Sequence, residues 1–519
     1  MSLRHFIRRR THRWAFACML ALSLAPSLAA QDDEDGDAAG DKPSKPGEHK
    51  IEVPADDAVT SEDSVNINGQ RVPYRVTVGN QPVWDADGEP VASLFYTYYE
   101  RSDVEDRSAR PLTISFNGGP GSASLWMHIA YTGPRLLEID DEGYPLQPYG
   151  IRENAHSILD VTDILYVDPV NTGFSRILND ADRGQFFGVN QDIRYLARWI
   201  DTFVTRQGRW TSPKFLIGES YGTTRVSGLA ARLQDSQWMF LNGVILVSPT
   251  GLGVEREGPV DDALPLPYYA ATAWYHGKLA DDLQGRDLED ILPEVEAFTL
   301  HELLPALAQG GSLPAPERAQ LTERYARYSG LKLPLVRQYN MAVPTPFFWK
   351  ELLRDEGLTV GRLDSRYRGF DREDAGSSPD FDPALSSWNH AFAPAINHYL
   401  RDLLGYETDL QYWVFGPVHP WDRDGDRTGW QLQQAMGENP YLHMLVQSGY
   451  YDGATDYFSA KYTMWNMDPT GRFQDRMTHK SYRSGHMMYL RSEDLKAAND
   501  DIREFIAGAI PGEGTPAKR

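Results

Sequence analysis

A serine between two glycines follows a short apolar run and could serve as a nucleophile. Residues 214–217 read as a strand, residues 218–222 are Gly-Glu-Ser-Tyr-Gly, and the next residues fit a helix. A strand that turns sharply into a helix places the serine, Ser220, at the tip of a strained turn that needs glycine on both sides. The pentapeptide alone is a weak signal, because glycine and serine are common in turns. An ordinary strand-to-helix loop is the alternative.

A glycine-rich loop lies upstream of this serine. Residues 117–122 read Asn-Gly-Gly-Pro-Gly-Ser and follow the strand-like residues 112–116. The loop lacks the lysine and the spacing of a phosphate-binding loop, which argues against nucleotide binding. A plain loop is possible, but a glycine-rich turn at an earlier strand end can also present backbone N–H groups to an oxyanion.

A serine nucleophile needs a base to take its proton and a carboxylate to orient that base. Asp452 follows the strand-like residues 442–449, and His486 follows a second such segment near Tyr482. Both lie in glycine-containing loops. The order Ser220, Asp452, His486 is the chain order of α/β-hydrolase triads, and all three follow predicted strands.

The elements around these loops predict an α/β fold with a central, mostly parallel sheet. Asn68-Gly69 between two alternating runs predicts a hairpin at an antiparallel entry to the sheet. Strands then alternate with helices over residues 63–253, and the pattern returns over 427–519. The intervening residues 254–426 are rich in helix formers, Pro, Tyr and Trp, and predict a mostly helical insertion.

The N-terminus predicts export. Residues 1–30 combine an arginine-rich start, a short apolar stretch and small residues at the end, as in a secretory signal peptide. Residues 31–62 are acidic and proline-rich without aromatics, which predicts a disordered leader. The single cysteine, Cys18, lies within the signal peptide, so the mature chain would have no disulfide. We therefore expect a bacterial periplasmic or extracellular protein.

Composition excludes several classes of function. The chain has 519 residues, of which 41% are hydrophobic, enough for a large core. Removing the five arginines of residues 1–30 takes the formal net charge from −22 to −27, which argues against nucleic-acid binding. The sequence has no second long apolar segment, so we expect no membrane insertion. The 13 histidines include no HExxH pair, so we expect no metal and no cofactor. The oligomeric state is not readable.

Four motifs together resemble the serine carboxypeptidase family (carboxypeptidase Y-like). They are Asn-Gly-Gly-Pro-Gly-Ser at 117–122, Gly-Glu-Ser-Tyr-Gly at 218–222, Gly-Tyr-Tyr-Asp at 449–452 and Gly-His at 485–486. The similarity runs from about Leu94 to the C-terminus. It implies an α/β-hydrolase fold whose helical cap is inserted after the nucleophile region, in agreement with the insertion at 254–426.

The resemblance also implies roles for individual residues. Ser220 would be the nucleophile, His486 the general acid and base, and Asp452 its orienting carboxylate. The backbone N–H groups of Gly119 and Tyr221 would form the oxyanion hole. The substrate's terminal carboxylate would be bound by Asn117, Gly118 and Glu219. Glu219 can bind a carboxylate only when it is protonated.

One position departs from the family pattern. Where the family has a second glutamate paired with the one before the serine, this chain has Tyr131. A phenol stays a donor at all ordinary pH. We hypothesise that Tyr131 still binds a carboxylate but weakens the family's preference for acid pH. A cleavage optimum well below about pH 5 would contradict this hypothesis.

The sequence thus predicts an exported serine carboxypeptidase that removes C-terminal residues from peptides with a free C-terminus through an acyl-enzyme. An esterase or acyltransferase on the same scaffold is the alternative, because the same triad serves esters. A non-catalytic binding protein is a third class, against which the intact triad argues.

Overall fold

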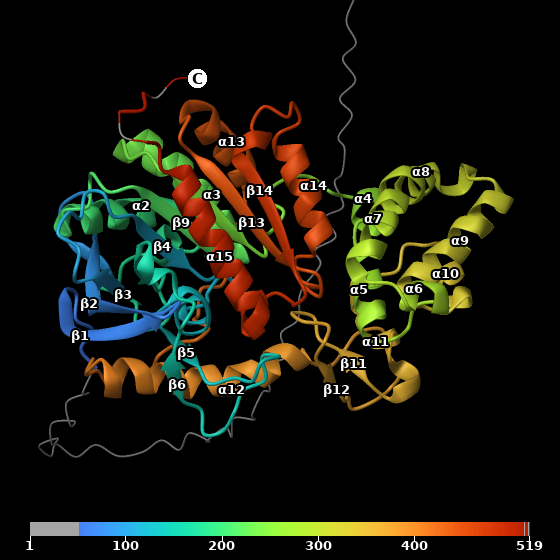
Figure 1. Cartoon of the computed structure of the whole chain (residues 1–519), viewed down its shortest axis with the longest axis horizontal. Coiled ribbons are helices and arrows are strands. Elements are labelled where there is room, and N and C mark those ends of the chain that lie inside the picture. The colour runs from blue at the N-terminus through green and yellow to red at the C-terminus, as the bar shows by residue number, and fades with distance from the viewer. Residues whose placement is uncertain (1–50, 513, 517, 519) are drawn as a thin grey trace, which may run out of the picture. The chain divides into compact units, whose positions relative to one another are not determined.

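A ten-stranded sheet runs through the part of the chain that this computed structural model describes, which is residues 51–512, 514–516 and 518 (Figure 1). Its order is β1-β2-β3-β7-β4-β9-β10-β13-β14, and β8 pairs with β3. The strands are β1 (Asp57–Ile67), β2 (Gln70–Trp84), β3 (Pro90–Arg101), β4 (Leu112–Phe116), β7 (Asp163–Val167), β8 (Arg176–Ile177), β9 (Lys214–Glu219), β10 (Gly243–Val247), β13 (His443–Gly449) and β14 (Met477–Tyr482). Two small ribbons pair β5 (Arg135–Leu137) with β6 (Ile151–Glu153) and β11 (Thr359–Val360) with β12 (Arg368–Gly369).

The predicted fold class is confirmed. The strands from β7 to β14 are parallel, and β1, β2 and β3 form the antiparallel entry. The predicted hairpin joins β1 to β2, with Asn68 at φ 48° and Gly69 at φ 81°. Since the carboxyl ends of parallel strands meet at one edge of a sheet, the loops after β4, β9, β10, β13 and β14 share that edge.

The leader is shorter than predicted. The predicted signal peptide and the leader up to residue 50 lie outside the described residues. Residues 57–62, which the sequence assigns to the leader, pair with residues 75–80 as the start of β1. The side chains of this stretch are mostly exposed, because β1 is an edge strand. An edge strand can be polar and acidic, so composition hid it.

Helices cover both faces of the parallel strands. They are α1 (Leu125–Met127), α2 (Val189–Arg206), α3 (Tyr221–Gln237), α4 (Pro259–Ala263), α5 (Leu266–Tyr275), α6 (Asp281–Gln284), α7 (Leu288–Phe298), α8 (Leu304–Gln309), α9 (Ala315–Ser329), α10 (Leu333–Gln338), α11 (Thr345–Glu351), α12 (Pro383–His398), α13 (Thr428–Glu438), α14 (Tyr457–Met467) and α15 (Ser492–Ala509). Successive strand residues alternate between the faces: Phe215 and Ile217 pack with α12 and α15, and Leu216 packs with α2, α3 and α13. The strands are buried on both faces, as expected of a parallel sheet.

The insertion is helical, as predicted, but it is shorter than residues 254–426. Helices α4–α11 have a hydrophobic core of their own over residues 263–360, in which Tyr269 stacks on Phe348 with ring centroids 4.0 Å apart. Helix α12 instead packs Trp388 and Phe392 into the core beneath the sheet. Helical periodicity alone cannot tell which core a helix joins, and this explains the misplaced boundary.

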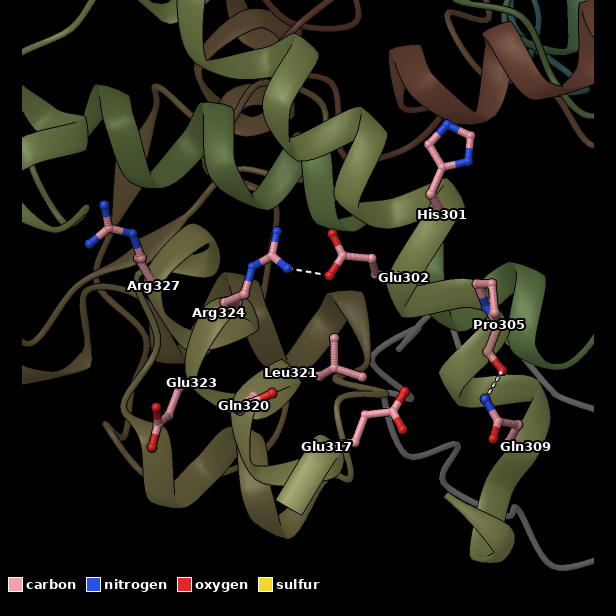
Figure 2. Close-up of a pocket in the computed structure, with 10 residues that line it drawn as sticks. All are labelled: His301, Glu302, Pro305, Gln309, Glu317, Gln320, Leu321, Glu323, Arg324 and Arg327. Carbon is pink, nitrogen blue, oxygen red and sulfur yellow. Dashed lines mark hydrogen bonds and ion pairs between the residues drawn. The ribbon is translucent and has the colours of Figure 1, made fainter. Parts of the chain in front are cut away.

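A hollow lies on the surface of the helical insertion. The hollow has a volume of about 660 Å³ and lies between α8, α9 and the π-helical turn η4 (Thr299–Leu303), where Glu302 pairs with Arg324. Figure 2 shows the residues that line it. None of the residues predicted for catalysis lines it. Of the helices in the described part, none combines the length and the apolar character of a membrane span.

Candidate active site

Ser220 lies in the strand-to-helix turn between β9 and α3. Its backbone has φ 57° and ψ −126°, a strained conformation for a residue with a side chain. A Cβ at Gly218 would lie 2.2 Å from the carbonyl oxygen of Gly222, and a Cβ at Gly222 would lie 2.9 Å from that of Phe116. Both glycines are therefore sterically required, and the turn presents Ser220 at the edge where the strands end.

Asp452 and His486 meet at the same edge. His486 Nδ1 donates to Asp452 Oδ2 over 2.7 Å, and Thr455 Oγ1 donates to the same oxygen over 2.7 Å. The backbone N–H groups of Ala454 and Thr455 donate to Oδ1 over 2.8 and 3.0 Å. Burial would raise the pKa of Asp452, but His486 and these hydrogen bonds lower it below its ordinary value. The carboxylate is thus ionised and fixes the imidazole with its proton on Nδ1.

The pKa of His486 has two opposing influences. Burial lowers it, but the Asp452 carboxylate outweighs burial and raises the pKa above its ordinary value.

The loops of the serine and the histidine are joined through the end of β10: the Ser220 N–H donates to Val247 O over 2.9 Å, and Ser248 Oγ donates to His486 O over 2.7 Å. Among the hydrogen bonds of the described residues none links Ser220 Oγ to His486 Nε2. Such bonds often form only when substrate is bound.

The glycine-rich loop packs directly on the serine turn. A Cβ on Gly118 would lie 2.5 Å from Tyr221 N and 2.9 Å from Ser220 Cβ. The hydrogen bonds found within residues 51–512 include none donated by the N–H groups of Gly119 or Tyr221. The close approach therefore leaves backbone donors of both segments free beside Ser220, as an oxyanion hole requires.

This packing makes Gly118 a sensitive position. In Gly118→Ala the new methyl group would meet backbone atoms of Glu219 and Tyr221, so the loop must move away from the turn. We expect kcat/KM to fall at least ~100-fold, the usual cost of losing one oxyanion donor. Gly508→Ala is the matched control, because nothing lies within 4 Å of a Cβ at that exposed helical position. Equal activity of the two variants in a steady-state assay would contradict the role of the loop.

Glu219 is buried directly before the serine. Burial raises the pKa of its carboxyl to about 7, although His486 and a hydrogen bond from Tyr489 oppose the rise. Asn117 also lies close enough to lower the pKa of Glu219. Its Oδ1 accepts from the N–H of Met127 over 3.0 Å. Its Nδ2, in contrast, has no hydrogen bond of good geometry. A carboxyl that holds a proton near neutral pH and a buried unpaired amide are two donors for an anionic ligand.

The Tyr131 hydroxyl does not bond to Glu219, the residue beside which the family pattern places Tyr131. It lies in the turn η1 (His128–Thr132), fully buried, and its hydroxyl donates to Gln447 over 2.6 Å. The hydroxyl that reaches Glu219 belongs to Tyr489, in the turn η9 (Met488–Leu490), whose ring stacks on that of Tyr131 with centroids 4.5 Å apart. The expected neighbour of Glu219 is therefore corrected from Tyr131 to Tyr489.

Two further residues of the site were missed. Thr455 supports Asp452, and an Asp followed by Thr three residues later is a common local hydrogen-bonding pattern that could have signalled it. Asp364 accepts from the Gly485 N–H over 3.1 Å, next to the histidine, and the adjacent Leu363 carbonyl accepts from His486 N–H over 2.7 Å. Asp364 belongs to the predicted insertion, and no local signal connects it to residues more than a hundred positions later.

Comparisons with known proteins agree with the motifs. Residues 83–294 match the family model described as serine carboxypeptidase. Serine carboxypeptidase-like 42 of Arabidopsis thaliana is 28% identical over 41% of this chain and 44% of its own length. A carboxypeptidase Y homolog of Arthroderma benhamiae is 26% identical over 31% of this chain and 30% of its own length. The chain thus spans less than half the length of these curated relatives.

A solved structure extends the similarity in fold. Kex1(delta)p, a prohormone-processing carboxypeptidase from Saccharomyces cerevisiae, matches 85% of this chain and 93% of its own, with a TM-score of 0.53 and 14% identity. At that identity the match concerns the fold alone, which is that of an α/β-hydrolase. Over residues 83–294, the sequence of this chain is similar to the serine carboxypeptidase family.

Proposed function

We propose that the protein is an exported serine carboxypeptidase that releases C-terminal residues from peptides through an acyl-enzyme on Ser220. The observation that carries the proposal is the pair formed by the buried Glu219 carboxyl and the unpaired Asn117 amide beside the strained Ser220. Donors for a carboxylate directly next to a nucleophile favour attack on the last peptide bond of a chain with a free C-terminus.

The chemistry follows from the hydrogen bonds around Asp452. Ser220 Oγ attacks the scissile carbonyl carbon while His486 Nε2 takes the hydroxyl proton, and Asp452 stabilises the imidazolium through Nδ1. The oxyanion lies against the N–H groups of Gly119 and Tyr221. The peptide C–N bond then breaks, His486 gives its proton to the departing amine, and an ester on Ser220 remains. Water hydrolyses that ester by the same steps and regenerates the serine.

Recognition of the C-terminus requires a neutral Glu219. An ionised Glu219 would repel the substrate carboxylate, whereas a protonated one donates to it. Asn117 Nδ2 and the backbone beside Gly118 would supply the remaining donors. This arrangement supports a peptide with a free C-terminus as the proposed substrate.

Three substrate classes test the proposal. Free-acid peptides should be trimmed, the same peptides with a C-terminal amide should be cut far more slowly, and simple aryl esters should be hydrolysed because they need only the triad. Hydrolysis of esters without trimming of peptides would instead establish the esterase or acyltransferase reading. A fluorophosphonate should label Ser220, and failure to do so in folded protein would leave only a binding function.

The pH dependence of peptide trimming is a further prediction. Glu219 must be protonated, and its pKa is raised to about 7, so trimming should decline above that pH. His486 must be neutral, and its raised pKa makes activity fall on the acid side. We expect a bell-shaped profile of kcat/KM centred near neutral pH. Glu219→Gln, whose amide donates at every pH, should remove the alkaline decline for free-acid peptides; an unchanged alkaline limb in that variant would exclude Glu219 as its cause.

We also propose that the protein is exported, because residues 1–30 have the pattern of a secretory signal peptide. Expression in a bacterium with a periplasm, followed by N-terminal sequencing of the mature protein, tests it. We expect the mature chain to begin after Ala29 or Ala30 and to react with no thiol reagent, since Cys18 is removed.

A further inference from the structure

Tyr489 contacts Glu219 in a way that the proposed triad and oxyanion hole do not require. Its hydroxyl donates to Glu219 Oε2, and this is the only hydrogen bond that the Glu219 carboxyl makes among the described residues. Both side chains are buried. Tyr489 therefore restrains the orientation of the Glu219 carboxyl. The second oxygen, Oε1, is left for another partner.

The Tyr131 ring packs against the Tyr489 ring, and the Tyr131 hydroxyl begins a buried row of hydrogen bonds. The two rings stack with an interplanar angle of 12°. Tyr131 donates to Gln447 Oε1 over 2.6 Å, and Gln447 Nε2 donates to Tyr482 OH over 2.8 Å. Tyr482 donates over 2.8 Å to Asp501. Asp501 also pairs with Lys480 at the surface. Each polar group in this buried row has a partner, and the row directs the Tyr131 hydroxyl to Gln447 and not to Glu219.

We propose that Tyr489 is a positioning residue for substrate-carboxylate recognition: its hydroxyl occupies Glu219 Oε2, so that Oε1 and Asn117 Nδ2 face the C-terminal carboxylate of the peptide. This inference rests on the proposed carboxypeptidase function and refines the carboxylate site. Tyr131 acts on the site only through its ring, which keeps Tyr489 in place.

The direction of the hydrogen bond from Tyr489 to Glu219 supports a positioning role for Tyr489. A tyrosine hydroxyl that donates to one oxygen of a protonated carboxyl favours the proton on the other oxygen, from which it can be donated to a substrate carboxylate. The groups that bear on Glu219 are His486, Asp452, Tyr489, Asn117 and, from the stacked ring, Tyr131. Of these, Tyr489 is the one whose hydroxyl donates to Glu219 in the structure.

The test compares Tyr489→Phe with the wild-type enzyme on a free-acid peptide and on an aryl ester without a carboxylate. At a pH well below the alkaline limb, we expect KM for the peptide to rise about ten-fold or more with kcat nearly unchanged, the usual effect of losing a hydrogen bond to a charged or protonated partner. Ester hydrolysis should be unchanged. The alkaline limb for the peptide should move to higher pH, because the Tyr489 hydrogen bond lowers the pKa of Glu219.

Two other tyrosines complete the design. Tyr166→Phe is the matched control, since Tyr166 is buried and hydrogen-bonded to Thr132 over 2.6 Å without contacting Glu219. Tyr131→Phe keeps the ring stack and should keep the preference for the free-acid peptide. The inference is overturned if Tyr489→Phe slows peptide and ester equally, if it changes neither, or if Tyr131→Phe alone abolishes the preference.

A binding experiment separates this inference from the proposed function. In the Ser220→Ala background, calorimetry should show tighter binding of a free-acid peptide than of its amide, and Tyr489→Phe should remove that difference. Wild-type enzyme that fails to trim peptides would overturn the carboxypeptidase proposal while this binding preference could still be measured. Loss of the preference in Tyr166→Phe as well would overturn the assignment to Tyr489.

Discussion

Replacing Ser220 with alanine is expected to reduce kcat on peptides and esters alike by about 10⁴- to 10⁶-fold, the range found when a serine nucleophile is removed. The residual rate would come from binding and the oxyanion donors alone. The fold should survive, because the turn is held by backbone contacts: the Ser220 N–H donates to Val247 O over 2.9 Å and its carbonyl accepts from Thr223 Oγ1 over 2.6 Å. Alanine retains both.

The measurement needs a matched serine. Ser227 lies buried on α3, the helix that follows the turn, and its hydroxyl has no hydrogen-bond partner. Ser227→Ala should therefore keep full activity and normal labelling by a fluorophosphonate, while Ser220→Ala should lose both. Retention of more than about a hundredth of the wild-type kcat in Ser220→Ala would show that another group carries the reaction.

Much of the fold could be predicted from local patterns. Buried strands with turn signals at their ends, such as β9 before Ser220 and β13 before Asp452, identify a parallel sheet whose loops gather at one edge. The hairpin at Asn68-Gly69 was readable for the same reason. The edge strand at Asp57 was not, because exposed acidic residues carry no apolar alternation.

The details of the proposed carboxylate site could not be predicted from the sequence. Tyr489 and Glu219 are 270 positions apart, so no spacing connects them. Tyr131 was predicted to face Glu219 because its position was matched to a family residue. A tyrosine is longer than a glutamate, and here its hydroxyl extends to Gln447, so the ring alone remains beside the site. Which neighbour the hydroxyl of a buried tyrosine reaches depends on packing across the sheet and not on residue type.

Asp452→Asn is expected to lower kcat by about 10⁴-fold while leaving the fold intact, as when the triad carboxylate of a serine protease is made an amide. The reason lies in how the loop orients the side chain. Oδ1 accepts from two backbone N–H groups, those of Ala454 and Thr455, and only an oxygen can take that place. The new amide nitrogen must then replace Oδ2 and face His486 Nδ1. An N–H that points at Nδ1 forces the imidazole proton onto Nε2, and the ring can no longer accept the proton of Ser220.

Asp456→Asn is the control for this variant. Asp456 is half-buried in the same loop and caps α14 by accepting from the Ser459 N–H over 2.8 Å, a role that asparagine performs equally well. It should retain wild-type kcat. In Asp452→Asn, NMR of the imidazole nitrogens should find the Nε2–H tautomer, and loss of the Asp452 charge should lower the pKa of His486, since that carboxylate is what raises it. A variant that keeps the Nδ1–H tautomer and a tenth of the wild-type kcat would mean that Asp452 does not orient the base, and the triad would have to be assigned anew.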